Sequence, residues 1–588
     1  MSHISQIYDS LERIGMIGSP STTTELTLDI LQSAVNKKLI GELATFKFLQ
    51  DGKDHYAIGQ ITEVELRNVW LEGASLRSIA RQKGTVNPVS EQQDTHIGKM
   101  IVSAVFSQNS DGFEQSMLGT VPATGTYIKI ADDSLLQTLL EKQKQQIFYL
   151  GHVYGSKPLL PMTFRHFGRG ENGAGEAYHI GVFGKTGSGK STLTKMILSA
   201  YMRFPELGIL ILDPQGEFSK DFSSNNSEEF KVPLKEIAQS HKKQAVVISV
   251  RNLVLDRWEL FEQILGESSF FERLSMPKGE NRDLACGLLI ENLRKHKVTL
   301  SKLHTRESFD KAWQILRDPN VQTIFYRSQN SRDRFNTTIQ NADTDNFYTE
   351  QWLPVANLFS EQRQNARKVE DALKWLIDSN PRNGVRPILV IDLSKEKAEG
   401  MYWNERIQAL VIKRLLQGLN SIAENYYKSN QNLNTMVVVD EAHRLAPKDN
   451  PEDDVLKSVK SIFIDSILTT RKYGLGWFFI SQTLSSIDKT IINQLRISFF
   501  GFGLSMGAEF QSLRELAGGD ANALKLYQSF KDPHSTLNPK NKQYSFMTIG
   551  PVSPLSFAGT PLFFTAFNNI KEFLEKNTLL NQHSMFEG

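Results

Sequence analysis

Short runs of apolar residues between positions 208 and 503 restrict the fold of this chain more than any other feature. They are GILIL, AVVISV, PILVI, TMVVV, WFFI and ISFFGFG, and none is longer than seven residues. Runs of this length fit β-strands and fall far short of the about 20 residues that a membrane-spanning helix needs. Because nearly every position is apolar, both faces of each strand must be buried, which is typical of a parallel sheet covered by helices on both sides.

The order of these runs predicts an α/β domain with a helical insertion. From His179 onwards, strand-like runs alternate with segments of helical periodicity, so we expect the core to comprise residues 151–254 and 386–545. Between them, residues 255–385 contain WELFEQIL, CGLLIENLRKH, FDKAWQILRD and EDALKWLID, with no strand-like run. This block is predicted to be helical and inserted into the α/β domain.

The two ends of the chain have a different texture. Within residues 1–150, the segments GELATFKFL, HYAIGQITEVEL, GKMIVSAVFSQ and GTYIKIAD predict a small β-barrel or sandwich, followed by a connecting helix that begins at Asp132 or Asp133. Residues 546–588 are apolar but contain Pro551, Pro554 and Pro561. Since proline interrupts an interior strand, we expect an extended brace, with a strand pair that completes the parent domain as the alternative.

Composition excludes several classes of protein. The chain of 588 residues has 67 basic and 65 acidic side chains, so it does not bind nucleic acid through bulk positive charge. A single cysteine, Cys286, excludes a disulfide framework and any cysteine-based zinc site. The N-terminus has no apolar stretch typical of a secretory signal. We therefore expect a cytoplasmic protein without a membrane anchor.

The segment GKTGSGKS matches the phosphate-binding pattern GxxxxGK[ST], between an apolar strand and a helix. Such a loop points backbone amides at phosphate oxygens, and an accidental glycine-rich turn is the alternative. Lys190 is expected to neutralise the β- and γ-phosphates of ATP, and Ser191 to offer its hydroxyl to Mg²⁺. The predicted nucleotide-binding residues are Gly184, Lys185, Thr186, Gly187, Ser188, Gly189, Lys190, Ser191 and Thr192.

Acidic and amide side chains follow other strands of the predicted sheet. Asp440 and Glu441 end TMVVV, where Asp440 is expected to hold Mg²⁺ through water and Glu441 to polarise the attacking water. An acidic pair that caps the next helix is the alternative. Gln482 ends another strand, where its amide could sense the γ-phosphate or be an ordinary loop amide. Asp213 and Glu217, in DPQGEF, could also lie at this edge of the sheet and have a functional role. A role in the turn at Pro214 and Gly216 explains them equally well.

Accessory motifs distinguish between classes of ATPase. The chain lacks an LSGGQ-like signature, and the letters DEAH at 440–443 are not followed by the second motor domain of DEAH-box helicases. Four segments instead resemble the HerA–FtsK class of ring translocases, HerA most of all. They are GKTGSGKST, ILDPQGEF, VVVDEAHRLAP and TTRKYGLGWFFISQTLSSIDKTIINQLR, and VPATGTYIKIADDSLLQTLL resembles the end of a HAS barrel.

This resemblance implies a RecA-like motor that assembles as a homohexamer and moves or unwinds double-stranded DNA. The nucleotide would lie between subunits, and Arg471, in the RK-aromatic-Gly element, would reach the γ-phosphate of the neighbour as an arginine finger. Arg496 is the second candidate, and a helix C-terminal cation is the alternative role for Arg471. The chain departs from the family at Glu176, where HerA-like motors often have arginine. Lys220, Lys242 and Lys243 are candidate contacts to DNA in a pore.

The resemblance leaves the biological setting open. The sequence has no nuclease metal cluster or NAD-binding pattern, so an effector would be a separate nuclease or a sirtuin-like NADase, as in antiphage systems. A DNA end-resection helicase with a NurA-like nuclease is an alternative, as is an ATP-regulated ring that serves as a scaffold for its effector. A conjugation or secretion ATPase is disfavoured by the lack of membrane helices and by the barrel-like N-terminus.

Overall fold

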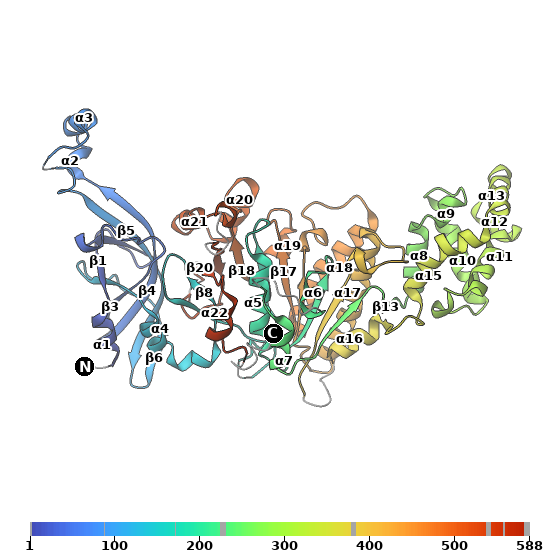
Figure 1. The fold of residues 1–588 in the computed structure, drawn as a ribbon, viewed down its shortest axis with the longest axis horizontal. Coiled ribbons are helices and arrows are strands. Elements are labelled where there is room, and N and C mark those ends of the chain that lie inside the picture. Colours follow the sequence, from blue (N-terminus) through green and yellow to red (C-terminus); the bar gives the residue numbers. More distant parts are fainter. Residues whose placement is uncertain are drawn as a thin grey trace.

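The structure is a computed structural model that describes residues 3–87, 89–170, 172–223, 231–377, 384–536, 542–556 and 559–580. Three bodies follow one another along the longest axis (Figure 1). A β-barrel formed by the N-terminal residues lies at one end, an α/β motor domain lies in the middle, and a helical insertion lies at the other end. None of the helices in the described ranges is long and apolar enough to cross a membrane.

The N-terminal body is the predicted small barrel. Six of the strands that the structure describes close in the order β2-β1-β7-β3-β4-β5, because β5 also pairs with β2, and β6 extends the far half of β5 as a hairpin. Its interior is filled by inward side chains such as Ile14, Leu28, Phe46 and Ile128. The strands are β1 (Arg13–Ile17), β2 (Glu25–Ile30), β3 (Leu43–Gln50), β4 (Lys53–Arg67), β5 (Thr95–Asn109), β6 (Gly112–Ser116) and β7 (Tyr127–Ile130).

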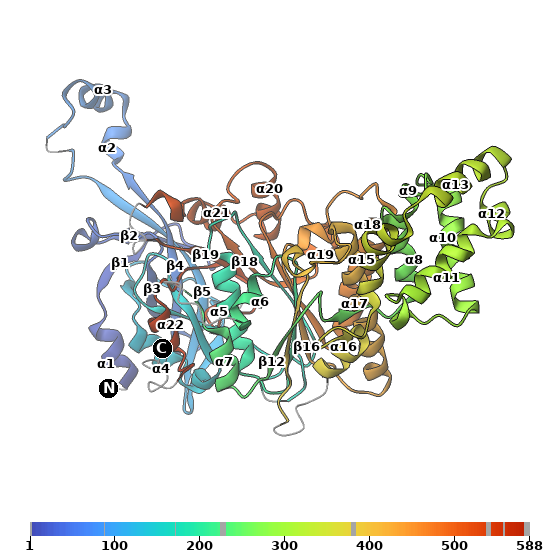
Figure 2. The same ribbon diagram turned by 45° about the vertical axis from the view of Figure 1, so that its right-hand side comes forward.

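Helices accompany the barrel at three places. Helix α1 (His3–Ser10) precedes it, and α2 (Val69–Glu72) and α3 (Ala74–Lys83) form an arm at the tip of the β4–β5 hairpin, which projects from the molecule (Figure 2). Helix α4 (Asp133–Leu139) is capped by Asp132, whose Oδ1 accepts from the N–H of Leu135 at 2.8 Å. The predicted connecting helix ends there, because a 3-10 segment η2 (Glu141–Gln146) and then a strand follow.

The motor domain is built on one mainly parallel sheet, as predicted. In the described residues its order is β12-β15-β11-β16-β17-β10-β18-β19-β20-β8-β9, and the pairs from β12 to β18 are parallel. The parallel strands are β10 (His179–Phe183), β11 (Gly208–Asp213), β12 (Ala245–Ser249), β15 (Ile388–Asp392), β16 (Thr435–Val439), β17 (Leu475–Ser481) and β18 (Leu495–Gly501). The antiparallel strands are β8 (Ile147–Val153), β9 (Leu159–Thr163), β19 (Ser545–Ile549) and β20 (Leu562–Ala566).

The continuous apolar runs are explained by two separate cores, one on each face of this sheet. Along β11, Leu210 and Leu212 pack into one core, and Ile209 and Ile211 into the other. The first core contains side chains of α16 (Val369–Ile377), α17 (Glu405–Lys428) and α18 (Asp454–Thr470). The second contains side chains of α5 (Lys190–Met202), α6 (Glu217–Ser223) and α7 (Leu234–Ser240). Both faces are therefore covered, as the sequence requires.

The insertion is helical over most of the predicted block, and its core is continuous with the first core of the motor. Trp352 lies at its centre: its indole N–H donates to the carbonyl of Leu303 at 2.7 Å, and its ring centroid lies 5.5 Å from that of Phe261. Two short strands, β13 (Leu253–Val254) and β14 (Arg367–Lys368), pair at its base. Its helices include α8 (Trp258–Glu267), α9 (Phe270–Arg273), α10 (Glu280–Lys295), α11 (Arg306–Arg317), α12 (Pro319–Phe325), α13 (Gln329–Asn341), α14 (Thr344–Asn346), the π-helical η4 (Phe347–Trp352) and α15 (Leu353–Ala356).

Two boundaries differ from the expectation. The limit at residue 150 falls inside β8, which belongs to the motor sheet. The expected brace at 546–588 instead contributes β19 and β20 to the same sheet, followed by α22 (Ile570–Lys576), so the strand-pair alternative describes it. The prolines do not prevent this, because Pro551 follows β19 and Pro561 precedes β20. Residues 557–558 and 581–588 of this segment lie outside the described residues.

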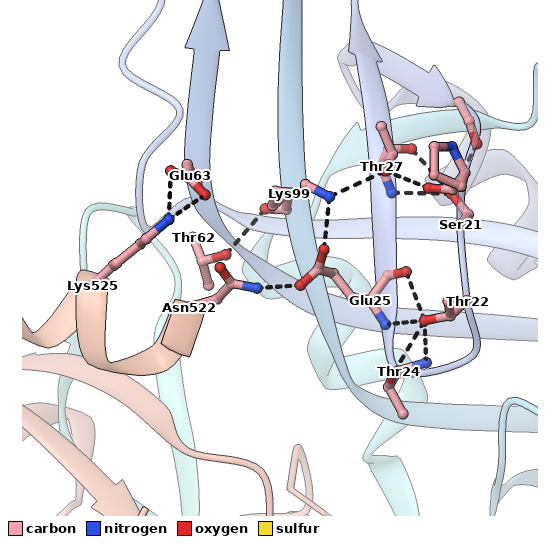
Figure 3. A network of polar contacts seen from close by, with 12 residues as sticks. Ser21, Thr22, Thr24, Glu25, Thr27, Thr62, Glu63, Lys99, Asn522 and Lys525 are labelled. Carbon is pink, nitrogen blue, oxygen red and sulfur yellow. Dashed lines mark hydrogen bonds and ion pairs between the residues drawn. The ribbon is translucent and has the colours of Figure 1, made fainter. Parts of the chain in front are cut away.

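Polar contacts join the barrel to the motor through α21 (Ala521–Gln528), as Figure 3 shows. Lys525 donates to both carboxylate oxygens of Glu63 on β4, at 2.9 and 3.0 Å. The amide of Asn522 donates to Glu25 on β2, whose other oxygen accepts from Lys99 on β5 at 2.8 Å. These contacts place α21, with the preceding α20 (Gly507–Leu516), between the barrel and the end of the central sheet. A short helix, α19 (Lys489–Ile492), lies between β17 and β18.

Candidate active site

The phosphate-binding loop joins β10 to α5 at the carboxyl end of the parallel strands, where the sequence placed it. Gly187 and Gly189 have φ values of 78° and 87°, a region that favours glycine. A side chain at either position would also collide with the ring of His534 or Tyr544, respectively, which lie against the loop. Glycine at these two positions therefore allows both the left-handed turn of the loop and the close packing of the two rings against it.

Lys190 is the first residue of α5, and only 9% of it is exposed. Its ammonium group donates to the carbonyl of Lys185 at 3.0 Å, so the side chain folds back over the loop. Burial lowers the pKa of Lys190, and the nearby carboxylates of Glu441, Asp440 and Glu217 oppose that shift. Such a cation needs an anionic partner in place of water, which a bound phosphate would supply.

The acidic pair lies directly beside this loop, at the end of β16. The pKa of Asp440 is raised to about 7, first by burial and then by the charges of Glu441 and Glu217. Glu441 has φ 52°, and its N–H donates to Asp440 Oδ1 at 2.9 Å, so the two carboxyl groups are held at a sharp turn. Neither residue caps a following helix with its side chain. The structure therefore contradicts the alternative in which the acidic pair caps the next helix.

Gln482, at the end of β17, connects the two motifs. Its Oε1 accepts from the hydroxyl of Thr186 at 2.8 Å, and its Nε2 donates to Glu441 Oε1 at 3.0 Å. One amide thus bridges the phosphate-binding loop and the expected catalytic carboxylate. His443 contacts the other oxygen of Glu441 at 3.4 Å, and burial lowers the pKa of His443, so this imidazole is neutral at pH 7. Both contacts of the Gln482 amide are with residues of the site, so Gln482 is not an ordinary loop amide.

The two acidic residues of the DPQGEF segment have different roles: Asp213 stabilises a turn, and Glu217 lies in the site. Asp213 accepts hydrogen bonds from the N–H groups of Gly216, Glu217 and Ser219 at 2.8–3.1 Å, which is turn chemistry, although burial raises its pKa to about 6. Glu217 instead faces α5: it accepts from the hydroxyl of Ser191 at 3.2 Å and from Lys195 at 3.0 Å. Glu217 is thus brought into the site, and Asp213 shapes the turn that holds it there.

Arg471 and Arg496 lie at the opposite edge of the sheet. Arg471 begins η8 (Arg471–Tyr473) just before β17, and Arg496 is the second residue of β18, so both are at the amino ends of parallel strands. Both guanidinium groups lie 3.7 Å from Glu176, one on each carboxylate oxygen. About half of each arginine side chain is exposed (54% and 50%). The structure therefore does not bring Arg471 together with the phosphate-binding loop of its own chain.

Residues 177–415 match the family model described as the central domain of the helicase HerA. This part of the motor is therefore similar to the P-loop ATPase domain of HerA. The matched range contains the phosphate-binding loop and the insertion, whereas Asp440, Glu441 and Gln482 lie beyond it. No curated protein sequence matches the chain.

Solved structures also match this chain at low sequence identity. VirB4 of Thermoanaerobacter pseudethanolicus is 15% identical, with 72% of this chain and 97% of that chain covered and a TM-score of 0.37. The bacterial conjugative coupling protein TrwBΔN70 is 13% identical, with 74% and 92% covered and a TM-score of 0.38. The genome packaging NTPase B204 of Sulfolobus turreted icosahedral virus 2, bound to ATP-γS, is 10% identical, with 66% and 96% covered and a TM-score of 0.28.

Several residues around the site were not found from the sequence. His534, in η9 (Pro533–Ser535), and Tyr544, just before β19, contact the phosphate-binding loop from more than 340 positions away in the chain, so no local motif points to them. Lys195 is one helical turn beyond Ser191, a spacing that places both on one face of α5. Lys243, predicted as a DNA contact, is buried and donates to the carbonyls of Leu207 and Arg386 at 2.8 and 3.0 Å, so that prediction was wrong.

Proposed function

We propose that this chain is one subunit of a homohexameric ring that hydrolyses ATP to move or unwind double-stranded DNA. The observation that carries the proposal is the division of the site between two edges of one sheet. The phosphate-binding loop, the acidic pair and Gln482 are at the carboxyl edge, whereas Arg471 and Arg496 are at the amino edge. A subunit built in this way completes its site with the amino edge of a neighbour.

The length of β17 supports this division. Its seven residues, at about 3.3 Å each, separate Arg471 from Gln482 by roughly 23 Å. An arginine side chain cannot cover that distance, so Arg471 cannot reach a nucleotide bound in its own subunit. In a closed ring, the same surface of each subunit meets the next subunit head to tail, and every site then receives one arginine. A finger of this kind stabilises the charge that develops on the γ-phosphate.

The chain's own residues fit ATP with Mg²⁺. Burial and the charges of Glu441 and Glu217 raise the pKa of Asp440, and Glu217 also contacts the Ser191 hydroxyl, so the site has an excess of carboxyl groups that suits a divalent cation. Ser191 and Asp440 would hold the metal, directly or through water. Bound Mg²⁺ would neutralise phosphate charge. Lys190 and the loop amides hold the phosphates, and Glu441, oriented by Gln482, accepts a proton from the attacking water.

The test of the motor is the rate of ATP hydrolysis with and without linear duplex DNA. Wild-type protein should hydrolyse ATP faster in the presence of duplex DNA, and Lys190→Ala should be inactive under both conditions. If the wild-type rate is the same with and without DNA, including in the presence of the cognate partner, the translocase proposal is wrong.

The shared site has its own test, because two defects on different edges should complement each other. Lys190→Ala disables the carboxyl edge and Arg471→Ala the amino edge, so each homogeneous ring should be inactive. Mixed subunits should regain hydrolysis wherever an intact carboxyl edge meets an intact amino edge. Mixtures without activity would contradict a finger supplied by the neighbour, and Arg496→Ala in the same scheme identifies the arginine used.

A separate effector, a nuclease or a sirtuin-like NADase, completes the proposal, with a cytoplasmic role in antiphage defence. What supports a partner is the arm α2–α3, which projects from the barrel with Val69 67% and Trp70 60% exposed. The same arm favours the second candidate, a ring that serves as a scaffold. Glu441→Gln distinguishes the two, since effector activity that survives the loss of hydrolysis supports the scaffold. If Trp70→Ala leaves co-purification of the effector unchanged, the arm is not its docking site.

A further inference from the structure

A cavity of about 340 Å³ lies between the barrel side of the molecule and the amino edge of the motor sheet. Gln115 from β6 and Gln143 and Gln146 from η2 line it on one side. Arg165, which follows β9, and Arg496 from β18 line it on the other. Its volume is within the range of small-molecule sites, and it is far from the phosphate-binding loop, at the other end of the parallel strands.

The lining of this cavity is cationic. Two guanidinium groups, three carboxamides and the hydroxyls of Thr163, Ser553 and Ser556 border it, and no carboxylate residue does among those described. Glu176, the nearest acidic partner of Arg496, lies outside the lining at 3.7 Å from Arg496. A pocket with this composition attracts anions.

Several of these donors are not committed to another group of the protein. Within the described ranges, the Arg165 guanidinium and the side-chain amides of Gln115, Gln143 and Gln146 make no hydrogen bond or ion pair to protein. The backbone of Arg165 is nevertheless fixed, since its N–H donates to the hydroxyl of Tyr178 at 3.3 Å and its carbonyl accepts from the same hydroxyl at 2.7 Å. The backbone that carries Arg165 is thus fixed, and the exposed side chains of Arg165 and Gln115 are free to turn toward a ligand.

We propose that this cavity binds the phosphates of a small phosphorylated ligand of the nucleoside polyphosphate class, separately from the phosphate-binding loop. Arginine pairs with phosphate through two parallel hydrogen bonds, and neutral amides add donors without adding charge. A polyphosphate that contacts Arg165 and Arg496 at once would also contact η2 and β6. Binding would therefore connect the barrel to the motor sheet and make their contact depend on the anion.

The experiment uses inorganic tripolyphosphate as the probe and the full chain with Lys190→Ala, which removes affinity at the phosphate-binding loop. Isothermal titration should detect one site per chain, with an affinity that falls as salt increases. Adding Arg165→Glu should raise the dissociation constant at least tenfold, and Gln146→Ala should raise it by about two- to fivefold. Arg169→Glu is the matched control, because Arg169 is also exposed but lines a different cavity.

Two results would overturn the inference. If tripolyphosphate does not bind the Lys190→Ala protein, any phosphate near Arg496 comes from a nucleotide on a neighbouring subunit, and no separate site exists. If it binds but Arg165→Glu and Arg169→Glu weaken it equally, the binding is general surface attraction. Arg165→Glu in the otherwise wild-type chain should keep basal ATP hydrolysis, which separates failure of this site from failure of the motor.

Discussion

The buried carboxyl group of Asp440 makes the metal-free protein less stable at neutral and alkaline pH, and Asp440→Asn should relieve this. The folded-state pKa, about 7, is above the ordinary value of 3.8, so ionisation is harder in the folded chain than in the unfolded chain. Stability from this group is fully present below about pH 3.8 and is lost as the pH rises to 7. Asparagine keeps the shape and the acceptor for the Glu441 N–H but carries no charge.

The magnitude follows from the shift. A difference of about 3 pKa units, at about 1.36 kcal/mol each, gives an upper limit of roughly 4 kcal/mol in the free energy of unfolding above pH 7. At pH 5 only about 1.2 units of that difference are realised, or roughly 1.7 kcal/mol. The variant should therefore melt above wild type at pH 8, and by clearly less at pH 5.

The assay is thermal unfolding of nucleotide-free protein at pH 8 and pH 5, with and without Mg²⁺. Mg²⁺ should raise the melting temperature of wild type at pH 8 but not that of Asp440→Asn, because the variant has lost the charge that the cation compensates. Glu396→Gln, which removes a carboxylate with 75% of its side chain exposed, is the control and should melt with wild type. Equal melting of Asp440→Asn and wild type at pH 8 would refute the reasoning.

Three further predictions concern the bridging amide of Gln482, the buried thiol of Cys286 and the tight turn at Gly474. Gln482→Ala should lower kcat for ATP hydrolysis about 10- to 100-fold with little change in KM, and a normal kcat would show that the bridge is dispensable. Burial raises the pKa of the Cys286 thiol, so a thiol reagent should titrate it only after unfolding, and rapid reaction of native protein would contradict this. Gly474→Ala should cost about 1–3 kcal/mol in urea unfolding, more than Gly400→Ala, because both have positive φ but only Gly474 faces Asn432.

Much of this architecture was predictable because local signals carried it. The apolar runs predicted strands buried on two faces, and Lys190, Asp440 and Gln482 came together because the carboxyl ends of parallel strands share one edge. The fate of residues 546–588 was harder to predict, since the same prolines that suggest a brace also fit between two strands. His534 and Tyr544 approach the loop only through the tertiary fold, and the burial of Lys243 depends on carbonyl groups from two other segments.

The two cores on opposite faces of the motor sheet have a consequence for variation between related chains. Adjacent residues such as Ile209 and Leu210 pack into different cores. Ile209 packs into the core that includes side chains of the barrel, and Leu210 packs into the core that includes side chains of the insertion. A lineage could therefore remodel its insertion through every second residue of these strands and leave the alternate set untouched. The insertion could thus change while the packing between the sheet and the barrel side is kept.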